Sequence, residues 1–203
     1  MIPDQMPRFN GNMAERLYQT YAYKDECNNR GMFAHVSWKW IIPFAEWIGN
    51  RKCLEIMAGA GYLSYALREK GIDIIASDDH SWHKHRDWQS VTEIIPLTAN
   101  QAIWQYGKQV EIIIMAWPHM DNSAYQALRL LHYINPNALL VYIGEWGGCT
   151  ANDNFFANFI EVDDPGFDAV ADQYERFDYI KDMMYLGKCT NEPVWVIHNN
   201  WEE

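Results

Sequence analysis

Two glycines and two acids between residues 51 and 79 have the types and spacing that best suit ligand chemistry in this chain. Gly59 and Gly61 lie two residues apart, and a glycine, which has no Cβ, lets the backbone approach a ligand closely. Glu55 precedes them and Asp78 follows them. A carboxylate such as Asp78 can accept hydrogen bonds from both hydroxyls of a ribose. The pattern indicates a site for a ligand that contains a nucleoside.

The elements that must position these residues follow directly from the pattern around them. Residues 53–57 form a short apolar run that reads as a buried parallel strand, and residues 58–61 form a tight glycine turn. Residues 62–70 have helical spacing and end at a glycine, and residues 72–76 form a second apolar run that leads to Ser77-Asp78-Asp79. A strand, glycine turn, helix and strand in this order predict half of a doubly wound nucleotide-binding fold.

Glu55 and Ser64 bear on which adenosine ligand such a unit would hold. A dinucleotide fingerprint requires a third glycine where this chain has Ser64, and its first strand normally carries no acid. A buried Glu55 is costly unless it holds the amides of the glycine loop or meets a cation. Both residues therefore count against a nicotinamide dinucleotide.

An acid two to four residues ahead of a glycine pair resembles the first motif of the class I S-adenosylmethionine (SAM)-dependent methyltransferases. Glu55, Met57, Gly59 and Gly61 occupy the acid and three glycine positions of that motif, with Met57 in place of the first glycine. The resemblance covers roughly residues 38–188 and implies SAM as the cofactor.

Further cofactor contacts are implied by the same resemblance. Asp78 matches the ribose-binding acid, and Asp79 competes with it for that role. Thr98 and Ala99 lie where the family often has an acid that contacts the adenine amino group, and Trp117 opens a segment that matches one proline of an amine-methylating motif. The predicted cofactor-binding residues are Glu55, Ala58, Gly59, Ala60, Gly61, Asp78, Asp79, Thr98, Ala99 and Trp117.

Two later strands are expected to bring candidate acceptor residues to the same edge of the sheet. Residues 110–116 lead to Trp117-Pro118-His119, and residues 138–143 lead to Gly144-Glu145-Trp146. We predict one pocket lined by Trp117, His119, Glu145 and Trp146, with His119 and Glu145 as catalytic candidates and the two tryptophans as substrate-binding residues. The alternatives are that His119 is a hydrogen-bonding surface residue and that residues 144–150 are a plain glycine turn.

No metal site is predicted. His80, His83 and His85 are close in sequence, but no carboxylate or cysteine completes a ligand spacing, which favours a solvated loop. Cys27, Cys53, Cys149 and Cys189 are widely separated and indicate neither a disulfide framework nor zinc.

Length and composition limit the remaining choices. The 203 residues fit one domain, in which we expect a helical N-terminal cap over residues 1–50 and a sheet core over residues 51–203. The predicted fold is α/β, with a doubly wound, mostly parallel sheet of seven strands and an antiparallel C-terminal hairpin. Candidate strands beyond those above are 91–96, 167–174, 182–188 and 193–199, and the last three compete for two places in the hairpin.

The net charge of −11 argues against a protein with a broad nucleic-acid-binding face. No apolar run is long enough to cross a bilayer, and the first residues do not resemble a signal peptide, so we expect a cytoplasmic protein. The sequence does not predict an oligomeric state.

The function predicted from the sequence is methyl transfer from SAM to an unidentified acceptor, with a small molecule or an exposed protein group favoured over nucleic acid. Two alternatives remain open. The first is a nicotinamide-dependent oxidoreductase. The second is a non-catalytic SAM-binding relic or interaction module of the same fold.

Overall fold

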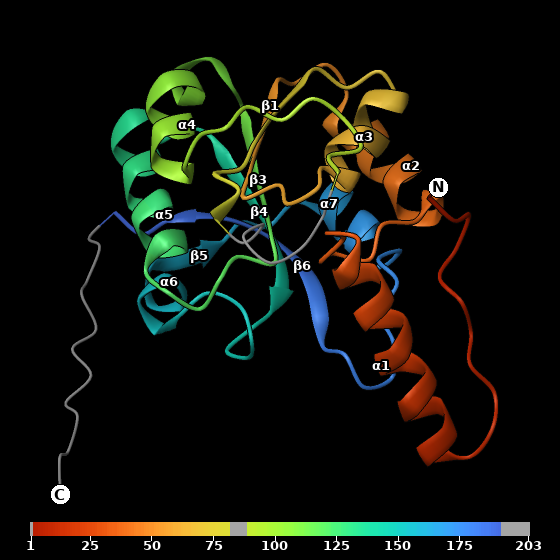
Figure 1. Ribbon diagram of the computed structural model, residues 1–203. Coiled ribbons are helices and arrows are strands. Elements are labelled where there is room, and N and C mark those ends of the chain that lie inside the picture. The colour runs from red at the N-terminus through yellow and green to blue at the C-terminus, as the bar shows by residue number, and fades with distance from the viewer. Residues whose placement is uncertain (1, 82–88, 192–203) are drawn as a thin grey trace, which may run out of the picture.

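The computed structural model describes residues 2–81 and 89–191, which form a Rossmann-like α/β domain (Figure 1). Its strands are β1 (Cys53–Ile56), β2 (Ile74–Ser77), β3 (Ile112–Ala116), β4 (Leu139–Glu145), β5 (Phe159–Glu161) and β6 (Asp182–Cys189). Its helices are α1 (Met13–Asn29), α2 (Trp38–Ile48), α3 (Tyr62–Glu69), α4 (Ala99–Tyr106), α5 (Ser123–Ile134), α6 (Asp153–Asn158), α7 (Pro165–Ala171) and the short 3-10 helix η2 (Gly107–Gln109).

The six strands form one sheet in the order β2-β1-β3-β4-β6-β5. The first four strands pair in parallel, and β6 runs antiparallel to both β4 and β5. The parallel half of the sheet and the antiparallel C-terminal pair therefore agree with the sequence prediction. In this order the carboxyl ends of β1, β2, β3 and β4 emerge at one edge of the sheet, where open α/β folds bind ligands.

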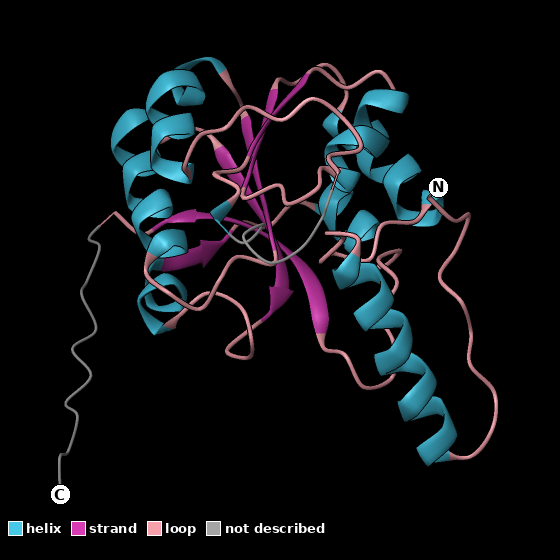
Figure 2. Ribbon diagram, viewed as in Figure 1, coloured by secondary structure: helices cyan, strands magenta, loops and turns pink. Residues whose placement is uncertain are grey.

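Helices cover both faces of the sheet (Figure 2). One face packs its apolar side chains against α2, α3 and α7, and the other face packs against α4, α5 and α6. Residues of β3 alternate between the two cores, since Ile112 and Ile114 belong to the first and Ile113 and Met115 to the second. Because both faces are buried, the strands read as continuous apolar runs in the sequence.

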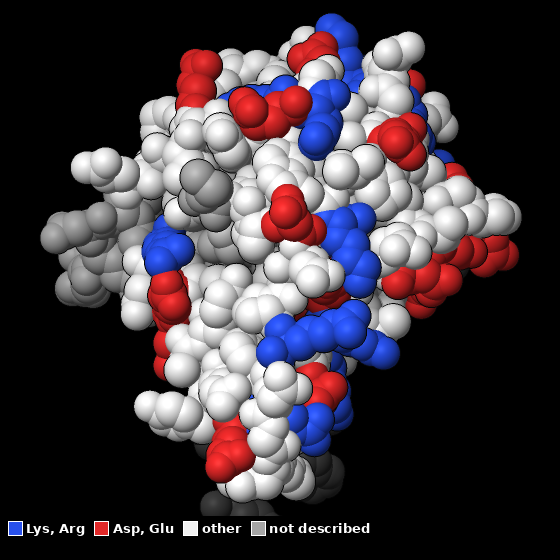
Figure 3. Space-filling model, turned by 90° about the vertical axis from the view of Figure 1, so that its right-hand side faces the viewer, with Lys and Arg blue, Asp and Glu red and all other residues white. Residues whose placement is uncertain are grey.

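The two N-terminal helices, α1 and α2, pack very differently. α2 is bound into the first core through Trp40, Ile41 and Phe44. α1 projects from the body of the protein (Figure 1) and buries only Thr20 and Cys27. Lys and Arg side chains are interspersed with Asp and Glu on the side that carries these two helices (Figure 3). Among residues 2–81 and 89–191, none of the helices is both long and apolar enough to cross a membrane.

The prediction of a strand over residues 167–174 is wrong, because this segment lies mostly in helix α7. The Asp164 side chain accepts hydrogen bonds from the backbone N–H groups of Gly166 and Phe167, at 2.9 Å and 3.0 Å. Pro165 occupies the first helical turn, where its missing N–H costs nothing. The sequence Asp-Pro-Gly, which would also suit a turn, is thus a helix start here.

The predicted seven strands are also not seen, since the described residues contain six. Within the predicted strand 91–96, only Ile95 pairs, in a single parallel bridge with Ser77 beside β2. Helix α6 ends at Asn158, and the chain then enters β5, which was not among the predicted strands. The candidate strand 193–199 and the histidines at positions 83 and 85 lie outside the described residues.

Candidate cofactor and acceptor site

A cavity of about 510 Å³ lies at the carboxyl edge of the parallel strands. The segments that follow β1, β2, β3 and β4 contribute to it, together with the starts of α4 and α5 and the end of α1. The residues that line it are Asn28, Phe33, Met57, Gly59, Asp78, Asp79, Ser81, Leu97, Thr98, Ala99, Asn100, Trp117, Pro118, His119, Asp121, Ser123, Gln126 and Cys149. Seven of the residues predicted from the sequence, from Gly59 to His119, are therefore brought together in one place.

The backbone N–H groups of the glycine loop all have partners within the protein. Those of Ala58, Ala60 and Gly61 donate to the backbone oxygens of Ser77, Gly31 and Ala58. The N–H of Gly59 donates to Asp78 Oδ2 at 2.8 Å. In a dinucleotide site such a loop offers its N–H groups to phosphate oxygens. Here residues 58–61 have no free donor left for a phosphate.

Gly59 and Gly61 are needed for different reasons. Gly59 has a φ of 58° and lines the cavity, and a Cβ at this position would lie 3.0 Å from the Gly31 carbonyl oxygen. Gly61 has a φ of 81° and faces the segment 92–94, where a Cβ would lie 2.9 Å from the side chain of Ile94. Gly61 thus packs the loop from behind, and Gly59 gives a ligand access to it.

Glu55 occupies the position at the start of α3 where an anion would otherwise bind. It is almost completely buried, and its Oε2 accepts a hydrogen bond from the Ser64 hydroxyl. Burial raises the pKa of Glu55 to about 7, against the opposing effect of hydrogen bonds from the Ser64 side chain and backbone. Glu55 does not line the large cavity, so it organises the helix start instead of facing a ligand there.

Asp78 lies at the end of β2 between the glycine loop and the cavity. Its Oδ2 accepts from Gly59 N at 2.8 Å, and its Oδ1 accepts from His80 N at 2.7 Å. A carboxylate has about four lone-pair positions, so two remain for ligand hydroxyls. Asp78 is largely buried, with 13% of its side chain exposed. Asp79 also lines the cavity but is exposed, and its Oδ1 accepts from Ser81 N.

The cavity lining is acidic. Among the described residues it contains the carboxylates of Asp78, Asp79 and Asp121 and no Lys or Arg. An acidic lining favours a ligand with a positive charge and disfavours one with phosphates. Thr98, which also lines the cavity, caps α4 by accepting a hydrogen bond from Gln101 N at 3.3 Å.

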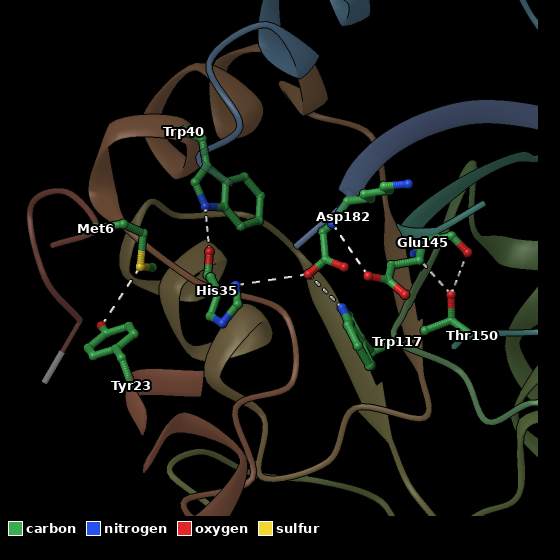
Figure 4. Close-up of polar contacts among 9 residues, drawn as sticks. Met6, Tyr23, His35, Trp40, Trp117, Glu145, Thr150 and Asp182 are labelled. Atoms are coloured by element: carbon green, nitrogen blue, oxygen red, sulfur yellow. Dashed lines mark hydrogen bonds and ion pairs between the residues drawn. The ribbon is translucent and has the colours of Figure 1, made fainter. Parts of the chain in front are cut away.

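Met57 and Trp117 have left-handed backbone conformations at the ends of β1 and β3. Their φ values are 57° and 53°, and both line the cavity. This region is unfavourable for bulky side chains, and strained residues of this kind cluster at ligand sites. The Trp117 indole donates through Nε1 to Asp182 Oδ2 at 2.8 Å (Figure 4), and Lys24 Nζ lies 4.0 Å from the centroid of its ring.

The four residues predicted to share an acceptor pocket do not all meet. Trp117 and His119 line the cavity, whereas Glu145 and Trp146 are not among its lining residues. Trp146 packs against Phe156 and Tyr185, with ring centroids 4.8 Å and 5.0 Å away, on the face of the sheet opposite the one where Trp117 packs. The expectation that Trp146 shapes this pocket is therefore wrong, because the chain turns it away directly after β4 ends.

Glu145 holds the loop that follows β4. Its carboxylate accepts from the backbone N–H groups of Cys149 at 3.2 Å and Lys181 at 3.4 Å. Partial burial acts to raise the pKa of Glu145, but these hydrogen bonds outweigh it and the pKa is lowered. Cys149, not Glu145, is the residue of this loop that lines the cavity. His119 is half-exposed, with its Nδ1 3.4 Å from Asp121 Oδ2.

Three features of the site were not predicted from the sequence. Asn28 and Phe33 line the cavity from the end of α1 and the loop after it, and neither was a candidate site residue in the sequence. Asp182 lies buried behind Trp117. One signal for Asp182 was present, since it shares the alternating register of Met184 and Leu186, both of which are buried.

No protein-family model matches the sequence, and no curated protein matches it. Many solved structures resemble it in fold. Several of them are methyltransferases, at low sequence identity. One of these structures is the 1,6-didemethyltoxoflavin-N1-methyltransferase of Burkholderia thailandensis, with 14% identity, 93% of this chain and 94% of that chain covered, and a TM-score of 0.47.

Two other similar structures are also distant in sequence. Magnesium protoporphyrin IX methyltransferase from Synechocystis PCC 6803 is 8% identical, with 90% of this chain and 86% of that chain covered and a TM-score of 0.43. Human N-acetylserotonin methyltransferase is 11% identical, with 88% of this chain covered and a TM-score of 0.43. This chain spans 57% of the human enzyme's length.

Proposed function

We propose that this chain binds SAM in the cavity and catalyses transfer of its methyl group to an acceptor. The observation that carries the proposal is the combination of a glycine loop whose N–H groups are all engaged and an acidic lining without Lys or Arg among the described residues. SAM carries a sulfonium and no phosphate, so it fits this lining. A nicotinamide dinucleotide would bring a pyrophosphate to a site whose described residues offer neither free loop amides nor a lining cation.

Different residues around the cavity would contact different parts of the ligand. Asp78 would hold the ribose through its two remaining lone-pair positions, and Asp79 lies next to it at the exposed side. Thr98 and Ala99, at the start of α4, would border the adenine, and Ala99 is buried there. Trp117 would adjoin the sulfonium, because an indole face attracts a positive charge.

SAM supplies a methyl group that the positively charged sulfur already activates. The protein then has to align the acceptor with the methyl group and exclude water. His119 lines the cavity beside Asp121, with which it forms a pair at 3.4 Å, and so could accept a proton from the acceptor. Glu145 would act indirectly, by holding the loop that places Cys149 on the cavity wall.

Thermal denaturation tests the cofactor. SAM and its product S-adenosylhomocysteine should both raise the melting temperature, and a ligand at one hundred times its dissociation constant adds about 2.7 kcal/mol of stability. NAD at the same concentration should have no effect. A shift with NAD, or no shift with either sulfur compound, contradicts the proposal.

Catalysis needs a separate test, because a SAM-binding protein without activity would pass the first one. The protein is incubated with SAM carrying a labelled methyl group and with a fraction of small metabolites, and formation of S-adenosylhomocysteine is measured. Turnover that depends on the fraction supports a methyltransferase. Binding without turnover, with metabolite and protein fractions alike, supports the non-catalytic alternative.

A further inference from the structure

A buried carboxylate lies directly behind the cavity wall. Asp182 opens β6, its side chain is fully buried, and its Oδ2 accepts the indole N–H of Trp117 at 2.8 Å (Figure 4). Its Oδ1 has no hydrogen-bond partner among the residues that the structure describes. The bond to Trp117 is therefore the only hydrogen bond that this carboxylate makes within that part of the chain.

The other charged and polar groups around Asp182 do not form a tight pair with it. His35 is fully buried, and its Nδ1 lies 3.9 Å from Asp182 Oδ2. Burial and the charge of Lys24 lower the pKa of His35 to about 4, so the ring is neutral at pH 7. Glu145 lies directly opposite Asp182 in the β4–β6 register. The Tyr174 hydroxyl lies near enough for the Asp182 charge to raise its pKa, after the larger effect of burial.

These surroundings make Asp182 costly as a core residue. Burial raises the pKa of Asp182 to about 6, against the lowering effects of the Trp117 hydrogen bond and of Lys24, so it is mostly ionised at pH 7. A buried charge with only one hydrogen bond destabilises the folded state, whereas an apolar side chain at the same position would not. Packing alone gives no reason for an acid at this position.

Trp117 is the group to which Asp182 is hydrogen-bonded. Its backbone is held in the left-handed region, where a bulky residue needs external constraints. One constraint is the backbone bond from Trp117 N to Ile143 O at 2.8 Å. The other two act on the ring, which bonds to Asp182 through its N–H and lies under the ammonium group of Lys24.

We infer that Asp182 is a positioning residue, which fixes the Trp117 indole as the wall of the cavity beside the reacting end of the ligand. Lys24 assists it by holding the ring and by compensating the buried charge. α1, which carries Lys24, and β6, which carries Asp182, are thereby coupled to the ligand site. For the identity of the ligand, the inference rests on the proposed function. The claim about the orientation of the ring does not.

Two substitutions of Asp182 separate positioning from packing. Asp182→Asn keeps an oxygen that can accept the indole N–H. Asp182→Leu has the same branching of side-chain heavy atoms, with two larger methyl groups, but no acceptor. Asp182→Asn should bind S-adenosylhomocysteine within about twofold of the unmodified protein. Asp182→Leu should bind it about tenfold more weakly, the effect expected when a buried donor loses its partner. Asp172→Asn, at an exposed position after α7, is the control.

A fluorine spectrum tests the same inference without a ligand. The protein is labelled with 5-fluorotryptophan, and the Trp117 signal is assigned as the one missing from Trp117→Phe. That signal should shift in Asp182→Leu and stay near its original position in Asp182→Asn. If S-adenosylhomocysteine does not bind at all, the proposed function fails, whereas the fluorine result still decides the inference.

The inference is overturned if both Asp182 variants leave the Trp117 signal and the affinity unchanged, or if they alter them equally. If Asp182→Leu does not fold, the double variant Trp117→Phe with Asp182→Leu provides the test. This variant removes donor and acceptor together, so the inference expects it to fold. A double variant that is also unfolded would show that Asp182 acts in the core and not through Trp117.

Discussion

Replacing Glu55 by glutamine should remove a pH-dependent cost that is built into the centre of the sheet. The folded protein raises the pKa of this carboxyl from 4.5 to about 7, chiefly by burial. The folded state therefore binds the proton more tightly than the unfolded state. The stabilisation that protonated Glu55 gives the folded state is fully present below about pH 4.5. It is lost as the pH rises through 7.

The size of the effect follows from the shift. Each pKa unit corresponds to about 1.4 kcal/mol, so ionised Glu55 costs about 3 kcal/mol above pH 7. Only part of this cost is present at pH 5. A glutamine side chain is neutral at every pH, and its carbonyl can still accept hydrogen bonds from Ser64. The stability of Glu55→Gln relative to the unmodified protein should thus rise by about 2–3 kcal/mol between pH 5 and pH 8.

Urea denaturation at pH 5 and pH 8, followed by tryptophan fluorescence, measures this difference. Glu69→Gln, at an exposed position in α3, serves as the control and should show no such change with pH. A stability difference for Glu55→Gln that is independent of pH, or that falls toward pH 8, would refute the reasoning. Glu55 would then not be a buried carboxyl at the start of α3, and the case against a phosphate ligand would weaken.

Three further predictions concern the cavity. Asp78→Ala should weaken binding of S-adenosylhomocysteine by about 1.5–3 kcal/mol, whereas Asp79→Ala should have a much smaller effect; calorimetric titration measures both, and equal losses would contradict the assigned ribose contact. Met57→Gly should be more stable than Met57→Ala by about 1 kcal/mol in urea denaturation, because both lose the side chain and only alanine is strained at a φ of 57°; the opposite order would contradict the left-handed conformation. Cys149 is the exposed one of the four free cysteines, so maleimide should label it first and S-adenosylhomocysteine should slow the labelling; labelling at an unchanged rate would place the ligand elsewhere.

Local sequence patterns were sufficient for the first half of the site. The strand, glycine turn, helix and strand over residues 53–77 form as predicted, because apolar runs, glycines and helical spacing act within short distances along the chain. The acid at the end of β2 follows from the same pattern. The sequence alone shows that Ser64 replaces the third glycine of a dinucleotide site. The structure adds that the Ser64 hydroxyl donates a hydrogen bond to Glu55.

The remaining features depend on contacts between distant segments. Asp182 and Trp117 are 65 residues apart, and no local pattern links them. The direction of Trp146 is set by the turn that follows β4 and by the aromatic cluster with Phe156 and Tyr185. The error at α7 had a local cause, because Asp164-Pro165 fits both a turn and a capped helix start.

The most direct test of the central claim is a crystal structure of the protein with S-adenosylhomocysteine. We expect electron density for adenosine in the cavity, with the ribose hydroxyls on Asp78 and the adenine beside Thr98 and Ala99. The sulfur should point toward Trp117. Density for the ligand outside this cavity, or a ribose that makes no contact with Asp78, would contradict the claim that this edge of the sheet is a SAM site.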